Sequence, residues 1–272
     1  MEAVELVFEG NSVPTLLGTD CCADMQQRLK ALLEPAPDKF FICSEAAIYA
    51  ACGGASMFTP EALGAPVEVV LMGKGEAEKS AETLLAMTQQ CFAGGVSKRS
   101  VIVALGGGVL LNVAGLAAAL IYRGIRLVHM PTTLMAQHDV ITSLKTAVNL
   151  CGRKNNFGTH YPSILNLVDV DFLRTLPPDQ YMSGVGELCK NALILGGEHA
   201  DVFERVMRPY RAELTLTSST SSAWKQLTAH SLELVKVANC NTNANLFEDK
   251  AGISFETEQT QRKITLCLSF VY

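Results

Sequence analysis

Short runs of β-branched and aromatic residues alternate with amphipathic, helix-like segments up to Phe172. The predicted strands are Val4–Phe8, Lys39–Cys43, Pro66–Met72, Ser100–Leu105, Arg126–Met130 and Ile164–Asp169. The predicted helices between them are Asp24–Leu33, Glu78–Ala93 and Val113–Ile121. Apolar strands separated by helices are typical of a parallel sheet that is covered on both faces. The pattern therefore predicts an α/β fold with a Rossmann-like parallel sheet.

The pattern changes after Phe172. Pro177 and Pro178 predict the start of a helix, because proline suits a first helical turn. Apolar residues then recur at helical spacing, at Met182, Val185, Cys189, Ala192 and Leu193. A second helix is predicted from Ser222 to Val237. We therefore expect an α/β domain over 1–172, a partial helical domain over 173–256 and an atypical tail over 257–272.

Composition narrows the class of protein. The 272 residues are 49% hydrophobic and 18% charged, which fits a folded globular chain. The net charge of −5, without a basic stripe, argues against a nucleic-acid partner. No apolar run approaches the roughly 18–20 residues that span a membrane. Nine cysteines without C-x-x-C spacing, and no secretory pattern at the start, predict reduced thiols and a cytoplasmic location.

A glycine turn follows one of the predicted strands. Gly106, Gly107 and Gly108 stand between Ser100–Leu105 and a helix expected to begin near Asn112. Such a turn lets the backbone approach a diphosphate, and the helix N-terminus adds free N–H groups. A tight turn without a ligand would have the same sequence, so the triplet alone leaves both interpretations open.

Polar residues gather after the next strand. Thr132 and Thr133 come at its C-terminal end, the edge where open α/β sheets bind ligands. A polar cluster follows, made of Asp139, Ser143, Lys145, Asn149, Lys154 and Asn155. Lysines neutralise phosphate and amides recognise hydroxyls, so the cluster suits a phosphorylated, hydroxyl-rich substrate. A solvated polar loop is the alternative.

These segments together resemble the 3-dehydroquinate synthase-like family of sugar-phosphate cyclases. The similar motifs occur in family order, as Gly75–Lys79, Gly106–Gly115, Tyr122–Gly124, Met130–Leu134, Lys145–Asn149, Gly152–Asn155, Leu173–Pro177 and Gly186–Lys190. The run Ile141–Lys145 and the Lys190-Asn191 pair favour the 2-deoxy-scyllo-inosose synthase branch. Thr146 is nearer to 3-dehydroquinate synthase itself, which remains the alternative.

The resemblance implies an NAD-using and metal-using phosphate lyase that converts a sugar phosphate to a carbocyclic ketone. NAD would be bound by Glu76, Lys79, Gly106, Gly107, Gly108, Asn112, Thr132, Thr133, Asp139, Lys154, Phe172 and Thr175. The phosphorylated sugar would be bound by Asp139, Lys145, Asn155, Lys190 and Lys236, with Lys145 and Glu256 as catalytic residues. Glu187 would be a ligand of zinc or cobalt, and the family also implies a homodimer.

The chain departs from the family's pattern after Glu256. Family members supply two further metal ligands from histidines in later elements, and Thr257–Thr260 stands where the first of these is expected. None of the five histidines, His129, His138, His160, His199 and His230, lies in a ligand motif. A catalytic metal site needs about three protein ligands. We therefore expect weak metal binding, and a catalytically inactive NAD-binding homologue is a further alternative. An iron-type alcohol dehydrogenase fits the motifs less well.

Overall fold

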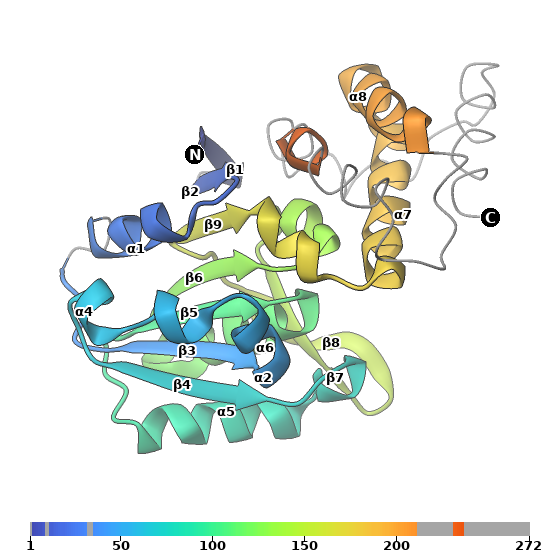
Figure 1. Cartoon of the computed structure of the whole chain (residues 1–272). Coiled ribbons are helices and arrows are strands. Elements are labelled where there is room, and N and C mark those ends of the chain that lie inside the picture. Colours follow the sequence, from blue (N-terminus) through green and yellow to red (C-terminus); the bar gives the residue numbers. More distant parts are fainter. Residues whose placement is uncertain (1, 9–10, 32–34, 211–230, 237–272) are drawn as a thin grey trace.

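A computed structural model describes residues 2–8, 11–31, 35–210 and 231–236. Figure 1 shows one large sheet, with further helices beyond the arrowheads of its strands. The sheet order is β1-β2-β9-β6-β5-β3-β4, and β7 and β8 form a separate hairpin. The strands are β1 (Glu2–Phe8), β2 (Asn11–Gly18), β3 (Phe40–Glu45), β4 (Val67–Met72), β5 (Val101–Gly106), β6 (Arg126–Pro131), β7 (Lys145–Leu150), β8 (Arg153–His160) and β9 (Leu165–Asp169).

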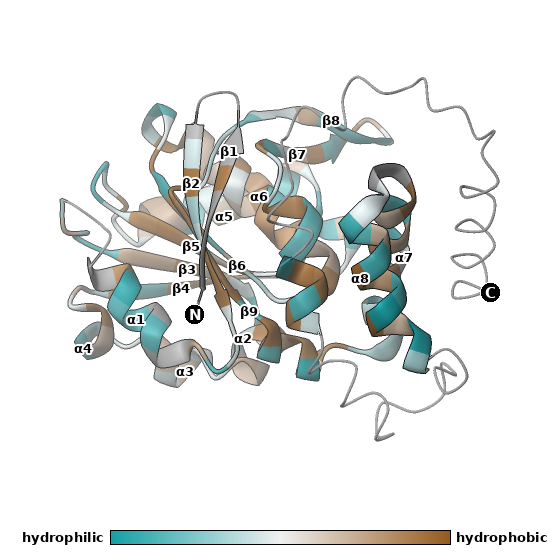
Figure 2. Ribbon diagram, turned by 90° about the horizontal axis from the view of Figure 1, so that it is seen from above, coloured by the Kyte–Doolittle hydropathy of each residue, from teal (hydrophilic) through white to brown (hydrophobic). Residues whose placement is uncertain are grey.

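Helices cover both faces of the sheet. They are α1 (Cys22–Ala31), α2 (Ala46–Ala51), α3 (Gly54–Met57), α4 (Pro60–Leu63), α5 (Ala81–Ala93), α6 (Gly108–Leu120), α7 (Pro178–Leu195) and α8 (Gly197–Met207). Buried side chains of α5 and α6 form one apolar core with one face, and those of α1, α3 and α4 form a second core with the other. All six residues of β5 are buried, as expected for a central parallel strand. In Figure 2 the central strands are mostly hydrophobic, whereas β8 is mostly hydrophilic.

The predicted Rossmann-like α/β fold is confirmed, with one addition at the sheet edge. Neighbouring strands from β2 to β4 in the sheet order all pair in parallel. β1 pairs with β2 in antiparallel fashion, and β2 was not predicted. Pro14 lies within β2, and proline weakens the sequence signal of a strand because it cannot donate a ladder hydrogen bond.

Two further expectations need correction. α6 begins at Gly108 rather than near Asn112, because Gly107 is itself the N-cap, in an extended conformation. The polar cluster after Thr133 is not an irregular loop. It contains a π-helical turn, Ala136–Val140, followed by the β7–β8 hairpin. Alternation with strongly polar residues hid these strands, since every residue of β8 is exposed.

The predicted helix at Pro177–Pro178 is confirmed as α7, with Pro178 in its first turn. Of the predicted helix Ser222–Val237, the structure describes 231–236, which are helical. The expected tail, 257–272, lies outside the described residues. Within the described ranges, no helix has both the length and the apolar character needed to cross a membrane.

Candidate active site

A cleft of about 1470 Å³ lies at the C-terminal ends of the parallel strands. Its walls come from the end of β3, the loop before α5, the first turn of α6, the end of β6, the π-helical turn, the β7–β8 hairpin and the start of α7. The sequence-predicted residues that line it are Glu76, Lys79, Gly107, Gly108, Asn112, Thr132, Thr133, Asp139, Lys145, Asn155 and Thr175. The fold therefore brings most of the predicted cofactor and substrate residues into one cavity.

The glycine turn offers bare backbone to this cleft. No side chain caps the first turn of α6, so its leading N–H groups remain available to an anion. A Cβ atom built on Gly107 would lie 3.0 Å from Cγ2 of Thr133, which leaves little room for a side chain. The turn is thus shaped for close approach of a ligand such as a diphosphate.

A hydrogen-bonded network joins the loop before α5 to the β7–β8 hairpin. Lys79 Nζ donates to Oδ1 of Asn155 at 2.5 Å, and Asn149 Nδ2 donates to Oε1 of Glu76 at 2.9 Å. The Asn155 backbone N–H donates to Asn149 Oδ1 at 2.9 Å, which closes the network. Asn155 has φ +55°, a conformation that asparagine tolerates better than most residues. The network holds an ammonium group inside the cleft wall.

Lys79 is only 9% exposed. Burial lowers the pKa of its ammonium, the Glu76 carboxylate opposes that shift, and the Lys154 charge adds to it. Lys154 itself is exposed, and its Nζ lies 3.7 Å from Oε1 of Glu76. It does not line the cleft, although the sequence predicted it as a cofactor residue.

Asn112 lines the cleft and also supports the hairpin. Its Nδ2 donates to the Gly108 carbonyl at 2.8 Å, and its Oδ1 accepts from the Ala147 backbone N–H at 3.1 Å. The side chain thus ties the first turn of α6 to β7. The sequence analysis predicted that Asn112 contacts the cofactor. The structure shows that Asn112 also positions β7 against α6.

Charged groups from three elements meet around Asp139. Asp139 is exposed at the cleft surface, but partial desolvation raises the pKa of its carboxyl, the Glu187 charge raises it further, and Lys190 and Lys145 oppose the shift. Asp139 comes from the π-helical turn, Lys145 from β7, and Glu187 and Lys190 from α7. The arrangement can bind an anion through the lysines and hold a proton on a carboxyl that is easier to protonate than usual.

Glu187 is bonded to Lys190 one turn further along α7, so the ion pair that Glu-x-x-Lys spacing favours is present. Neither residue lines the cleft directly. Among the described residues, no group of three or more His, Cys, Asp or Glu side chains is placed to hold a metal ion. Glu187 is therefore a single candidate ligand in this part of the chain.

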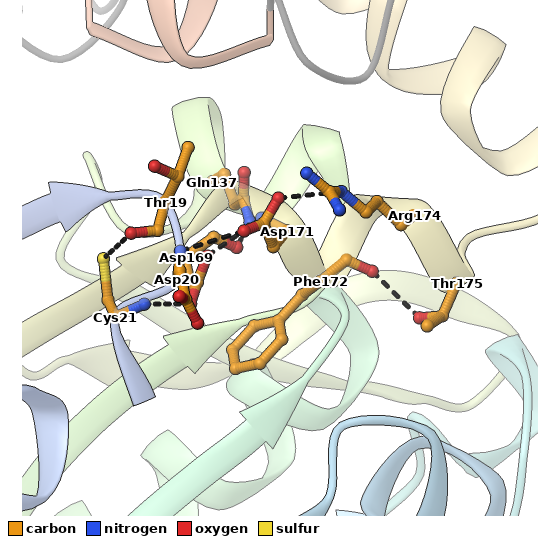
Figure 3. Close-up of polar contacts among 9 residues, drawn as sticks. All are labelled: Thr19, Asp20, Cys21, Gln137, Asp169, Asp171, Phe172, Arg174 and Thr175. Atoms are coloured by element: carbon orange, nitrogen blue, oxygen red, sulfur yellow. Dashed lines mark hydrogen bonds and ion pairs between the residues drawn. The ribbon is translucent and has the colours of Figure 1, made fainter. Parts of the chain in front are cut away.

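Phe172 and Thr175 lie in the short helical turn Val170–Thr175 that follows β9 (Figure 3). Asp169 caps this turn, since its Oδ1 accepts from the Asp171 N–H at 2.9 Å and its Oδ2 from the Cys21 N–H at 2.8 Å. Thr175 Oγ1 donates to the Phe172 carbonyl at 2.9 Å. Thr175 reaches the cleft, whereas Phe172 is buried in the core beneath it.

Gly106 lies at the end of β5 and does not line the cleft; its backbone carbonyl accepts from the Thr132 N–H at 2.9 Å. Lys236 lies in the helical segment 231–236 and is not among the residues that line the cleft. Glu256 is outside the described residues.

Glu45 was missed by the sequence analysis. It ends β3, next to the strand that carries the glycine turn, and it lines the cleft near Lys74. Burial raises the pKa of its carboxyl, the Lys74 charge opposes this, and Glu78 adds to it. An acidic residue at the end of a strand beside the glycine turn can accept hydrogen bonds from ribose hydroxyls. The available signal was an acidic residue two positions after the predicted strand Lys39–Cys43, but the strand order was needed to use it.

The chain is similar in sequence and in structure to known proteins. Residues 69–183 match the 3-dehydroquinate synthase N-terminal family. A 2-deoxy-scyllo-inosose synthase from Streptomyces fradiae is 39% identical over 209 residues, which are 77% of this chain and 48% of that protein. The crystal structure of 2-deoxy-scyllo-inosose synthase complexed with carbaglucose-6-phosphate, NAD+ and Co2+ has a TM-score of 0.73 and 28% identity, and the match covers 92% of this chain and 66% of that one.

A 2-epi-5-epi-valiolone synthase from Streptomyces hygroscopicus with NAD+ and Zn2+ bound has a TM-score of 0.68 and 26% identity, over 88% of this chain and 64% of that one. The fold and the cleft define a Rossmann-like α/β protein with a candidate ligand site at the strand ends. Over residues 69–183 the chain is similar to the 3-dehydroquinate synthase N-terminal family, and 2-deoxy-scyllo-inosose synthases are among its similar relatives. It spans about half the length of the curated relatives it matches.

Proposed function

We propose that the chain is an NAD-dependent sugar-phosphate cyclase that eliminates phosphate from a sugar phosphate such as glucose 6-phosphate and forms a carbocyclic ketone of the 2-deoxy-scyllo-inosose type. The observation that supports this most strongly is the shared cleft. Gly107 and Gly108 line the same cavity as Asp139, Lys145 and Asn155. A dinucleotide on the glycine side would therefore meet a phosphorylated sugar on the charged side.

The described residues fit NAD. The uncapped first turn of α6 suits the diphosphate, Lys79 adds a positive charge, and Glu45 suits a ribose. Bound NAD+ supplies reversible oxidation of a ring carbinol to a ketone, which acidifies the neighbouring C–H. The cleft's contribution is to hold the sugar ring in one orientation against the nicotinamide.

Lys145 and Asn155 suit the sugar phosphate, since an ammonium neutralises phosphate and an amide recognises hydroxyls. Asp139 is suited to take up and return a proton beside the ring, because partial desolvation makes its carboxyl easier to protonate. Lys190, Lys236, Phe172, Thr175 and Glu256 keep the roles that the family resemblance implies, as proposals.

The metal fits less well. The related structures hold Co2+ or Zn2+. Glu187 is the ligand position that the family resemblance implies here. In the described part of the chain it is one carboxylate, already bonded to Lys190. We therefore assign no step to a metal.

The test is phosphate release by the purified chain with NAD+, from glucose 6-phosphate and from 3-deoxy-D-arabino-heptulosonate 7-phosphate. Release from the first supports the proposal, and release from the second alone supports a 3-dehydroquinate synthase instead. Lys145→Met is expected to lower the rate at least about 100-fold, because a phosphate charge loses its counterion. Lys98→Met, at an exposed position outside the cleft, is the matched control.

A second candidate is an NAD-binding homologue without turnover. The observation that favours it is the lack of a set of three metal ligands among the described residues. NAD+ binding without phosphate release from either sugar, in buffer with Co2+ or Zn2+, would support it and contradict the cyclase. The family also implies a homodimer, which light scattering of the purified chain would test.

A further inference from the structure

Three consecutive residues of the π-helical turn Ala136–Val140 contact three different parts of the molecule. Gln137 Nε2 donates to the carbonyls of Pro131 at 3.1 Å and Asp169 at 2.9 Å, at the ends of β6 and β9. His138 Nε2 lies 3.2 Å from the Gly184 carbonyl of α7. Asp139 lines the cleft. The turn therefore connects the sheet, the helix and the site, and π-helical turns are frequent at functional positions.

The contact between His138 and α7 is buried and close. His138 is 1% exposed, and because a carbonyl only accepts, the proton of this bond lies on Nε2. A Cβ atom on Gly184 would lie 2.7 Å from Leu134 Cβ and 2.8 Å from the Met135 nitrogen. A glycine is thus required where the helix meets the turn, and the imidazole forms the polar link at the same place.

The position of α7 matters to the cleft because the helix carries two of the charges that act on Asp139. Gly184 precedes Glu187 by three residues, so the two lie on one side of the helix. Glu187 and Lys190 both act on the Asp139 carboxyl, with opposite signs. A shift of α7 would therefore change the electrostatic effects of Glu187 and Lys190 on the Asp139 carboxyl together.

We propose that His138 is a positioning residue, whose hydrogen bond to the Gly184 carbonyl holds α7 against the π-helical turn and thereby places Glu187 and Lys190 beside Asp139. The residue acts through the helix and does not itself touch the ligand. The placement of α7 by His138 does not depend on the proposed function. Its effect on sugar-phosphate binding does rest on the proposed function.

Hydrogen–deuterium exchange of the α7 amides tests the placement directly. His138→Leu removes the donor while keeping apolar bulk, and exchange around Gly184–Leu188 is expected to become at least about tenfold faster, because the buried hydrogen bond that ties α7 to the turn is lost. His138→Gln keeps an amide N–H at a similar reach and should stay within about threefold of the parent chain. His138→Asn, which is too short to reach Gly184, replaces the leucine variant if that one does not fold.

His129→Leu is the matched control. His129 is also buried, at 7% exposure, and neither of its ring nitrogens has a hydrogen-bond partner in the described part of the chain. It lies on β6, so its replacement should leave α7 exchange unchanged. Equal acceleration in this control, or no acceleration in His138→Leu and His138→Asn, would overturn the proposal.

Ligand binding gives a second measurement. NAD+ affinity of His138→Leu should stay within about twofold of the parent chain, because Lys79, Gly107 and Thr133 belong to the α/β part. Glucose 6-phosphate affinity should fall about tenfold and return in His138→Gln. A parallel loss of both affinities would indicate general destabilisation and contradict the proposal. If the parent chain does not bind glucose 6-phosphate, the proposed function fails, and amide exchange alone decides on His138.

Discussion

The two sides of the cleft are built in different ways. The glycine side uses backbone groups and short side chains at the ends of adjacent parallel strands, where a Cβ atom on Gly107 would lie 3.0 Å from Cγ2 of Thr133. The opposite side depends on charged side chains from the π-helical turn, β7 and α7, which meet around Asp139. The sheet geometry suffices to form the first side. The second exists only when separate elements dock together, so it should be more sensitive to single substitutions at the junctions.

The largest expected effect is on the free energy of unfolding at acidic pH. Burial lowers the pKa of His129 in the sheet and of His138 at the junction from 6.5 to about 4. The unfolded chain binds protons below about 6.5 while the folded chain keeps both rings neutral, so the free energy of unfolding falls as pH drops from about 6.5 to about 4. His129→Leu should reduce that fall by about 3 kcal/mol.

The measurement is urea unfolding of both proteins at pH 4 and pH 7. The raised pKa values of Asp139 and Asp169 act in the opposite direction, since those carboxyls favour the folded state at low pH. They are present in both proteins and cancel in the difference. Identical pH dependence of the two chains would show that His129 is not held neutral.

Gly107→Val tests whether the glycine side needs bare backbone. We expect NAD+ binding to weaken about 100-fold, because the side chain would occupy the approach of the diphosphate. Calorimetry of NAD+ binding measures it. The variant should be repeated with Thr133→Ser, which removes the methyl group nearest to the new side chain. Full recovery in the double variant would mean that strain at Thr133, rather than exclusion of the ligand, caused the loss.

Lys79→Met should have a smaller effect on the same side. It removes the bond to Asn155 and a positive charge in the cleft wall, and NAD+ affinity should fall about tenfold. Lys98→Met is again the control, because its position is exposed and outside the cleft. An unchanged affinity would remove Lys79 from the cofactor site and leave it as a support for the hairpin.

Gly186→Ala is expected to have the smallest effect, and a stabilising one. Gly186 lies inside α7, and a Cβ atom there would meet nothing within 4 Å. Replacing a helical glycine with alanine gains about 0.5–1 kcal/mol. Thermal unfolding measures the gain. A decrease in stability would mean that α7 packs against residues outside the described ranges at this position.

The sequence predicted the central strands and the glycine turn because their signals are local. β5 is a continuous apolar run that ends at the glycine turn Gly106–Gly108, and β6 is buried at five of its six positions although it contains Arg126 and His129. β2, β7 and β8 escaped prediction because their residues are polar or include proline, and their pairing with distant segments stabilises them. The π-helical turn escaped for the same reason, since Gln137 anchors it to β6 and β9.

Some residues of the candidate site could be predicted from sequence motifs, and others became visible only in the tertiary structure. Family motifs in the sequence identified Lys79, Asp139, Lys145 and Asn155, and the structure places all four on one cleft. The sequence could not show that Glu45 joins them, because that depends on β3 lying beside β5. It also could not show that His138 bonds Gly184, which is 46 residues away.

By itself, the sequence determined the α/β class, the family resemblance and about a third of the residues that line the cleft, because apolar periodicity and short motifs are local properties of the chain. The tertiary structure alone decided which strands are neighbours and where α7 docks. It also decided how desolvation and nearby charges alter the ionisation of Asp139 and Lys79. These properties depend on groups far apart in the chain, since desolvation and Coulomb interactions act through space.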